Sequence, residues 1–143
     1  MTTNLYSFVG LFSRQLDTAA HILAKGAAHA AATGVSETDM LGWRLIEDMS
    51  PLSFQLMLVC NFARAWPARV AGLPPPADIT ADLAEKLDVA GFQAAIAEAK
   101  TCLATLTPEP FAGHENAPLT VTADCPIVIW PRALTVVAYV RIQ

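Results

Sequence analysis

The segment that most constrains the fold is PLSFQLMLVCNFARAWPARVA, residues 51 to 71. Read as a helix, it carries one apolar stripe made of Leu52, Leu56, Val59, Ala63, Trp66 and Val70. A second apolar side carries Phe54, Leu58 and Ala65. A helix that is apolar on two sides needs neighbours on both of them. We therefore expect an inner helix of an all-α domain, with Ser50 as its N-cap and Pro51 at its first position.

Other helices are predicted on either side of this segment. Apolar residues recur at steps of three and four over residues 5 to 32, and Gly34 ends the pattern. Ser36 predicts a short element over 37 to 42, followed by Trp43, Leu45 and Ile46 as apolar anchors of the connection. GLPPPAD, residues 72 to 78, predicts a stiff connector. A third long helix is expected from Leu83 or Asp88, or from as early as Thr80, to Leu106.

The pattern changes after Pro108. The β-branched runs 119–123 and 126–130 predict a small hairpin. The tail from 132 to 143 suits either a strand or a short helix. With 143 residues, the chain is expected to form one domain over 1–143.

Composition and charge narrow the classes of function. The formal charge of −4 argues against nucleic acid, whose phosphate backbone needs a basic surface. No apolar run reaches the roughly 18 residues that span a bilayer, so no membrane partner is expected. The N-terminus lacks the positive region of a signal peptide. Cys60, Cys102 and Cys125 are far apart and odd in number, which favours reduced thiols in a cytoplasmic protein.

Three quoted segments, in order along the chain, carry a resemblance. LAKGAAHAAATGV (23 to 35), RLIEDMSPLSFQLMLVCNFARA (44 to 65) and RVAGLPPP (69 to 76) resemble a bacterial family of unknown function. That family is similar to the DinB/YfiT superfamily. The stretch from Asp48 through Met49, Pro51 and Leu52 to Gln55 is the most specific part. The resemblance implies a DinB-like up-down four-helix bundle, with the hairpin inserted before a shortened fourth helix.

The resemblance leaves two functions open. Metal-binding DinB-like proteins use a histidine in the middle of helix two and a histidine pair in helix four. Here the middle of helix two reads Val59-Cys60-Asn61-Phe62, so that site does not carry over. We therefore expect a non-catalytic bundle without a cofactor, able to bind a small apolar ligand. The alternative is a metal-dependent thiol transferase or hydrolase with rearranged ligands.

Four residues are the candidates for chemistry, each with a structural reading beside it. Glu47 and Asp48 suit metal ligands or a general acid/base pair, or a charged approach to a helix N-terminus, and Asp48 is the better functional candidate. Cys60 is a candidate nucleophile without a histidine nearby, and the structural reading is a buried thiol. Asn61 is a candidate pocket residue.

If Asn61 is buried, it needs a polar partner. The pattern does not demand one, so Asn61→Leu is expected to cost less stability than Leu56→Ala. The aromatic residues Phe54, Phe62 and Trp66 suit a core better than a cofactor site.

The shortened fourth helix leads to an expected partner. Residues 132 to 143 give at most about 18 Å of helix, against about 42 Å for residues 5 to 32. Part of the apolar groove would then be bare. A groove of that size is unusual on a monomer. We therefore expect a homodimer.

The histidines generate a prediction about metals. His21 and His29 are eight residues apart, whereas a metal-binding pair on one helix prefers three or four, and His114 has no partner nearby in the sequence. We therefore expect no stoichiometric, tightly bound transition metal. Elemental analysis that finds about one zinc or nickel per chain, lost when His21 or His29 is replaced, would contradict this expectation.

Overall fold

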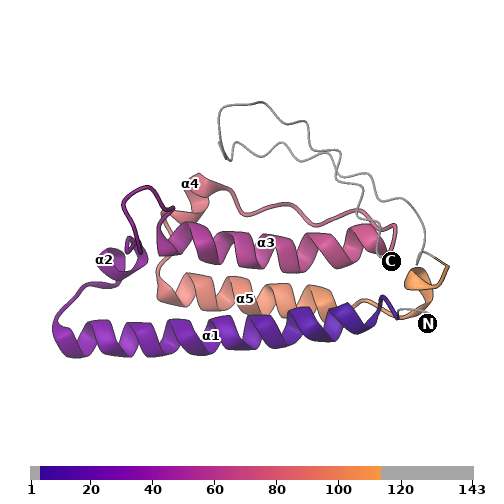
Figure 1. Ribbon diagram of the computed structural model, residues 1–143, viewed down its shortest axis with the longest axis horizontal. Helices are drawn as coiled ribbons and strands as arrows, with labels where there is room; N and C mark the ends of the chain where they lie inside the picture. The colour runs from indigo at the N-terminus through magenta and orange to yellow at the C-terminus, as the bar shows by residue number, and fades with distance from the viewer. Residues whose placement is uncertain (1–3, 114–143) are drawn as a thin grey trace.

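The computed structural model describes residues 4–113, and in that part of the chain three long helices pack side by side (Figure 1). They are α1 (Ser7–Thr33), α3 (Leu52–Val70) and α5 (Val89–Ala104). Shorter elements are α2 (Glu37–Leu41), α4 (Ala81–Ala84) and a 3-10 turn, Glu109–Phe111. The expected all-helical character is confirmed for these residues, among which there is no strand. The expected hairpin and fourth helix fall outside the described residues.

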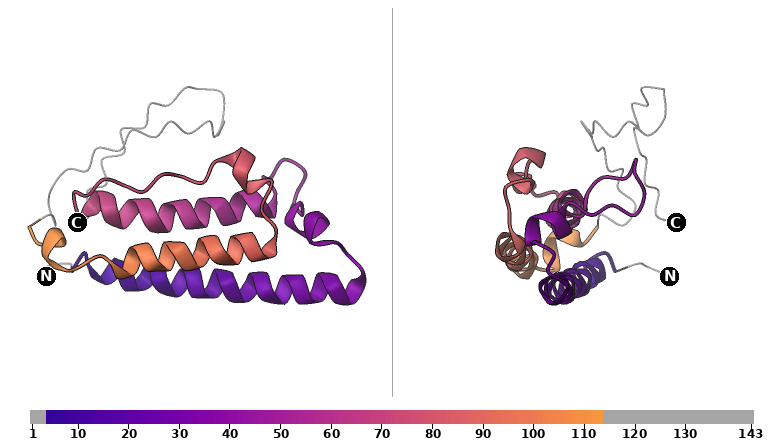
Figure 2. Two further views of the ribbon diagram at one scale, coloured as in Figure 1. Left: turned by 180° about the vertical axis from the view of Figure 1, so that it is seen from behind. Right: turned by 90° about the vertical axis from the view of Figure 1, so that its left-hand side faces the viewer.

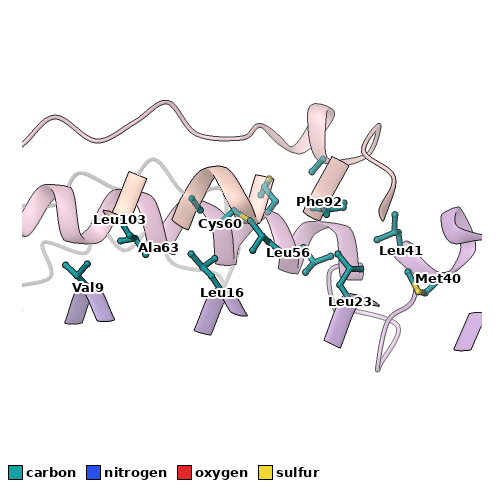
Figure 3. Packing of buried hydrophobic residues seen from close by; sticks show 14 of the residues in the cluster. Val9, Leu16, Leu23, Met40, Leu41, Leu56, Cys60, Ala63, Phe92 and Leu103 are labelled. Atoms are coloured by element: carbon teal, nitrogen blue, oxygen red, sulfur yellow. The ribbon is translucent and has the colours of Figure 1, made fainter. Parts of the chain in front are cut away.

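The core lies between the three long helices. Val9, Leu16, Leu23 and Ala30 are all buried and are seven residues apart, so they fall on one line along α1. Figure 3 shows that this line faces side chains of α3 and α5, among them Leu56, Cys60, Ala63, Phe92 and Leu103. Because Leu16, Cys60 and Phe92 have no exposed surface, all three helices contribute to the closed centre of the core.

Caps fix several helix ends where the sequence predicts them. Gly34 ends α1 with a φ of 73°, a value that glycine adopts without strain. The hydroxyl of Ser36 accepts from the amide of Asp39 and begins α2. Thr80 and Asp88 both act as N-caps, accepting from Leu83 and Gly91. Of the starting points expected for the third long helix, Asp88 is the N-cap of α5, and the segment after Thr80 forms the separate short helix α4.

Expectations for the segment between α2 and α3 are partly wrong. Pro51 occupies the N-cap position without a side-chain cap, so Ser50 lies outside the helix. The amide of Leu52 donates instead to the carbonyl of Trp43, which closes the connection. The supposed anchors of this connection are exposed: Trp43 by 46 %, Leu45 by 88 % and Ile46 by 63 %. Hydrogen bonds close the loop without these apolar side chains, because the Arg44 side chain also donates to the carbonyl of Met49 over 2.8 Å.

The aromatic residues of α3 differ in their burial. Phe54 packs against the core, whereas Phe62 is 47 % exposed. The interpretation of Phe62 as a core residue is therefore wrong. Val59, one turn earlier, is exposed by 38 %. Most sides of α3 are thus buried, but some of its apolar residues are exposed.

The direction of α5 differs from a simple up-down order. Figure 1 and its reverse view in Figure 2 show α3 and α5 running in the same direction, both opposite to α1. The contacts agree, since Gln93 and Lys100 of α5 reach Ala20 and Asp17 of α1 in reversed order. The expected up-down topology is therefore wrong between α3 and α5.

The cause of this direction is the connector, residues 73–80, which we call the strap. It has no regular secondary structure and returns along α3 to the end where α3 began. At about 3.1 Å per residue for polyproline geometry, it spans about 25 Å. The 19 residues of α3 span about 28 Å. The strap therefore returns along most of the length of α3, and α4 lies between its end and the start of α5. No helix within residues 4–113 is long and apolar enough to cross a membrane.

Candidate functional site

The strap is held on α3 by the side chain of Asn61. The Nδ2 group of Asn61 donates to the carbonyl of Ile79 over 2.9 Å, and the amide of Ile79 donates to Oδ1 of Asn61 over 2.9 Å. This two-bond exchange has the pattern of a residue pair in an antiparallel sheet. Asn61 is 7 % exposed and Ile79 is partly buried, so water reaches these bonds only from the strap side. A side-chain amide thus takes the place of a neighbouring strand for one residue of the strap.

Arg64 lies one turn further along α3 and joins three elements. Its Nη2 donates to Oδ1 of Asn61 over 3.1 Å and to the carbonyl of Ala77 in the strap over 2.9 Å. Its Nη1 contacts Oε1 of Glu98 on α5 at 3.3 Å. The Arg64 side chain is 7 % exposed and that of Glu98 is 67 % exposed. Arg64 therefore places a buried cation where α3, α5 and the strap meet.

A cleft of about 260 Å³ lies beside this cation. Its walls come from the second half of α3, the beginning of the strap and the end of α5. The lining is mainly apolar, with one charged side chain: Arg64, Ala68, Leu73, Pro74, Pro76, Thr101, Cys102, Thr105 and Leu106. Apolar walls with few polar groups are typical of small-molecule sites, although this cleft is smaller than their usual range of about 300–1,000 Å³.

The polar groups of the cleft differ in the hydrogen-bond donors that remain for a ligand. The hydroxyls of Thr101 and Thr105 donate to the helix carbonyls of Ala97 and Cys102. Their protons are therefore already used. Nε of Arg64 is buried and has no hydrogen-bond partner among residues 4–113. Arg64 is thus the group in the cleft with spare donor capacity.

Cys60 is fully buried in the core. Burial raises the pKa of its thiol; the nearby Arg64 charge acts against this shift, and Glu98 adds to it. A raised pKa leaves less thiolate at neutral pH, and the thiolate is the reactive form. The arrangement therefore matches a structural thiol more closely than a nucleophile.

Asp48 and Glu47 lie in an exposed turn before α3. Cys60 is eight residues inside α3, about 12 Å along its axis. The structure therefore does not bring Asp48 together with Cys60 as one catalytic group. His21 and His29 are exposed on α1, and His114 lies outside the described residues. Within residues 4–113, no three His, Cys, Asp or Glu side chains are grouped so that they could hold a metal ion.

Sequence reasoning singled out Asn61 but missed Arg64. The signal was present, because the two polar residues are three apart in an otherwise apolar helix and so share a face. Asn61 was a candidate pocket residue, and the structure places it next to the cleft with its amide bonded to the strap. Arg64 is the neighbour that lines the cleft itself.

The described fold and cleft define a small helical-bundle protein with a strap-covered side. The family model for a domain of unknown function, DUF1993, matches residues 5–134, and the chain belongs to this family. Comparison with curated proteins gives no match. Comparison with solved structures gives none either.

The bonds of Asn61 change the expectation for its replacement. Asn61→Leu leaves the part-buried Ile79 amide and carbonyl and one buried Arg64 donor without their partner, at up to about 1–3 kcal/mol for each group. Leu56→Ala creates a cavity, at about 2–5 kcal/mol. We therefore expect Asn61→Leu to be at least as destabilising as Leu56→Ala in denaturant melts. A loss below about 1 kcal/mol for Asn61→Leu would show that the strap contributes little to stability.

Proposed function

We propose that the protein is a non-catalytic, DinB-like helical bundle that binds a small apolar ligand in the cleft beneath the strap. The observation that carries this proposal is the cleft of about 260 Å³, walled by strap prolines and by apolar side chains of α3 and α5. The DinB-like assignment rests on the sequence resemblance. A metal-dependent transferase or hydrolase would need ligands from outside residues 4–113.

A neutral fluorescent probe such as Nile red tests binding in the cleft. Ala68 lines the cleft and is 6 % exposed, so Ala68→Leu puts added side-chain volume into it. Ala94→Leu makes the same chemical change on the exposed side of α5 and serves as the matched control. We expect Ala68→Leu to weaken probe binding about tenfold, or about 1.4 kcal/mol. Thermal melts first establish that both variants fold.

Equal probe affinity for the two folded variants would contradict the proposal, because the probe would then be bound elsewhere. Competition by 1-octanol for the probe on the unchanged protein gives a second reading. Loss of that competition in the Ala68→Leu variant is the expected result.

We also propose that two copies associate through the side of the bundle away from α5. Asp17 and Ala20 mark the side of α1 that contacts α5. Leu11 and Ile22 lie roughly opposite to it by helical period and are exposed by 40 % and 62 %. On α3, Phe62 also lies far from the Arg64 side that reaches α5. An apolar face of this kind supports a two-fold interface above roughly 1,000 Å².

Light scattering at micromolar concentration tests the dimer. We expect a mass of twice the 15.2 kDa of the chain. Phe62→Asp should shift the mass toward one chain because it places a charge in the interface. Leu83→Asp on α4 is the control, since Leu83 is 48 % exposed and Phe62 47 %. A soluble monomer of the unchanged chain would contradict the proposal.

A cytoplasmic location is part of the same proposal. Its support is chemical: Cys60 and Cys102 are both free thiols among the described residues. Reduced cysteines are typical of proteins in a reducing compartment.

A further inference from the structure

The cleft contains a cation whose bonding is incomplete. A guanidinium group has five N–H donors. Three donor bonds of Arg64 are made within residues 4–113, to Asn61, Ala77 and Glu98. Nε is buried without a partner. Buried donors are nearly always bonded in folded proteins, so an unbonded donor on a residue that lines a cleft leaves a place for an acceptor on a ligand.

The charge of Arg64 is also weakly compensated. Glu98 is the acid paired with it among the described residues, and that side chain is 67 % exposed. Water screens such a pair strongly. The other acceptors, Asn61 and the Ala77 carbonyl, are neutral. Every other residue that lines the cleft is uncharged. A side chain that is nine-tenths buried therefore keeps a positive charge with no buried counter-charge nearby, which is unfavourable.

The remaining polar groups of the cleft do not offer an alternative donor. The Thr101 and Thr105 hydroxyls donate to carbonyls of their own helix. The thiol of Cys102 is a weak donor. A ligand that bonds in this cleft therefore does so as an acceptor, and it gains most if that acceptor is an anion, because charge-assisted hydrogen bonds are the stronger ones.

We propose that the ligand is a small amphiphilic carboxylic acid, bound as its carboxylate. One carboxylate oxygen accepts from Arg64, and the hydrocarbon part contacts Pro74, Pro76 and Leu106. This inference rests on the proposed function, since it names the class of ligand for the same cleft. It requires a small adjustment of the strap or of Arg64, because Nε is closed to solvent.

Protection of Cys102 from iodoacetamide gives a readout at the cleft itself. Cys102 lines the cleft and is partly exposed. Cys60 is fully buried and reacts slowly, because burial raises the pKa of its thiol. Replacing Cys125 by serine removes the third thiol. The probes are octanoate, 1-octanol and octylamine, which share a chain length and differ in charge, each used below its micellar concentration.

We expect octanoate to slow alkylation of Cys102 at concentrations about tenfold lower than 1-octanol, with octylamine weakest, a ratio that corresponds to about 1.4 kcal/mol. Variants of Arg64 are a poor test because this side chain also holds the strap. Glu98→Gln is the sharper variant, since Glu98 is exposed and competes with the ligand for the same guanidinium. We expect Glu98→Gln to tighten octanoate binding about two- to fivefold and to leave 1-octanol binding unchanged.

The outcomes separate the two proposals. Equal protection by octanoate and 1-octanol overturns the carboxylate inference and leaves the apolar site standing. Weaker octanoate binding by Glu98→Gln also overturns the inference, because Glu98 would then be supporting the ligand. Protection by none of the three probes overturns the carboxylate inference and counts against the apolar site as well. In that case, Nile red affinity in the Ala68→Leu and Ala94→Leu variants decides whether the cleft binds any apolar molecule.

Discussion

The paired hydrogen bonds between Asn61 and Ile79 are the interaction on which the described architecture depends. They fix the strap along α3, and the strap decides where α4 and α5 begin. A connector without regular secondary structure normally leaves its amides and carbonyls to water. Here one residue of it is bonded in both directions by a buried side chain. The side chain of a single asparagine therefore helps to hold in place the connector that joins two parallel helices.

Arg64 links a third element, α5, to α3 and the strap. Asn61 joins α3 to the strap, and Arg64 continues the network to α5 through Glu98. Arg64 also lines the cleft. The side chain that joins α3, α5 and the strap is therefore also the one with an unbonded donor among the described residues. A ligand acceptor at Arg64 would thus be coupled to the strap through bonds that already exist.

Much of the helical layout could be predicted from the sequence, because local signals determine it. The seven-residue spacing of Val9, Leu16 and Leu23 marks α1, and the caps at Ser36 and Gly34 mark neighbouring ends. The failures depend on contacts between residues distant in the chain. The topology of α3 and α5 is set by strap length together with side-chain bonds to its backbone. Asn61 was a candidate pocket residue, but a sequence pattern does not reveal which carbonyl Arg64 will reach, so the walls of the cleft and its charge were not predicted.

The strap has a consequence for which changes of length the fold tolerates. Loops usually accept insertions more readily than helices do. In this chain the strap spans nearly the length of α3, about 25 Å against about 28 Å, and bonds at Ala77 and Ile79 fix the register between them. One added turn of α3, about 5.4 Å, has to be matched by about two strap residues of about 3.1 Å each. The lengths of the helix and of the connector are therefore coupled, and a change of length in one requires a compensating change in the other.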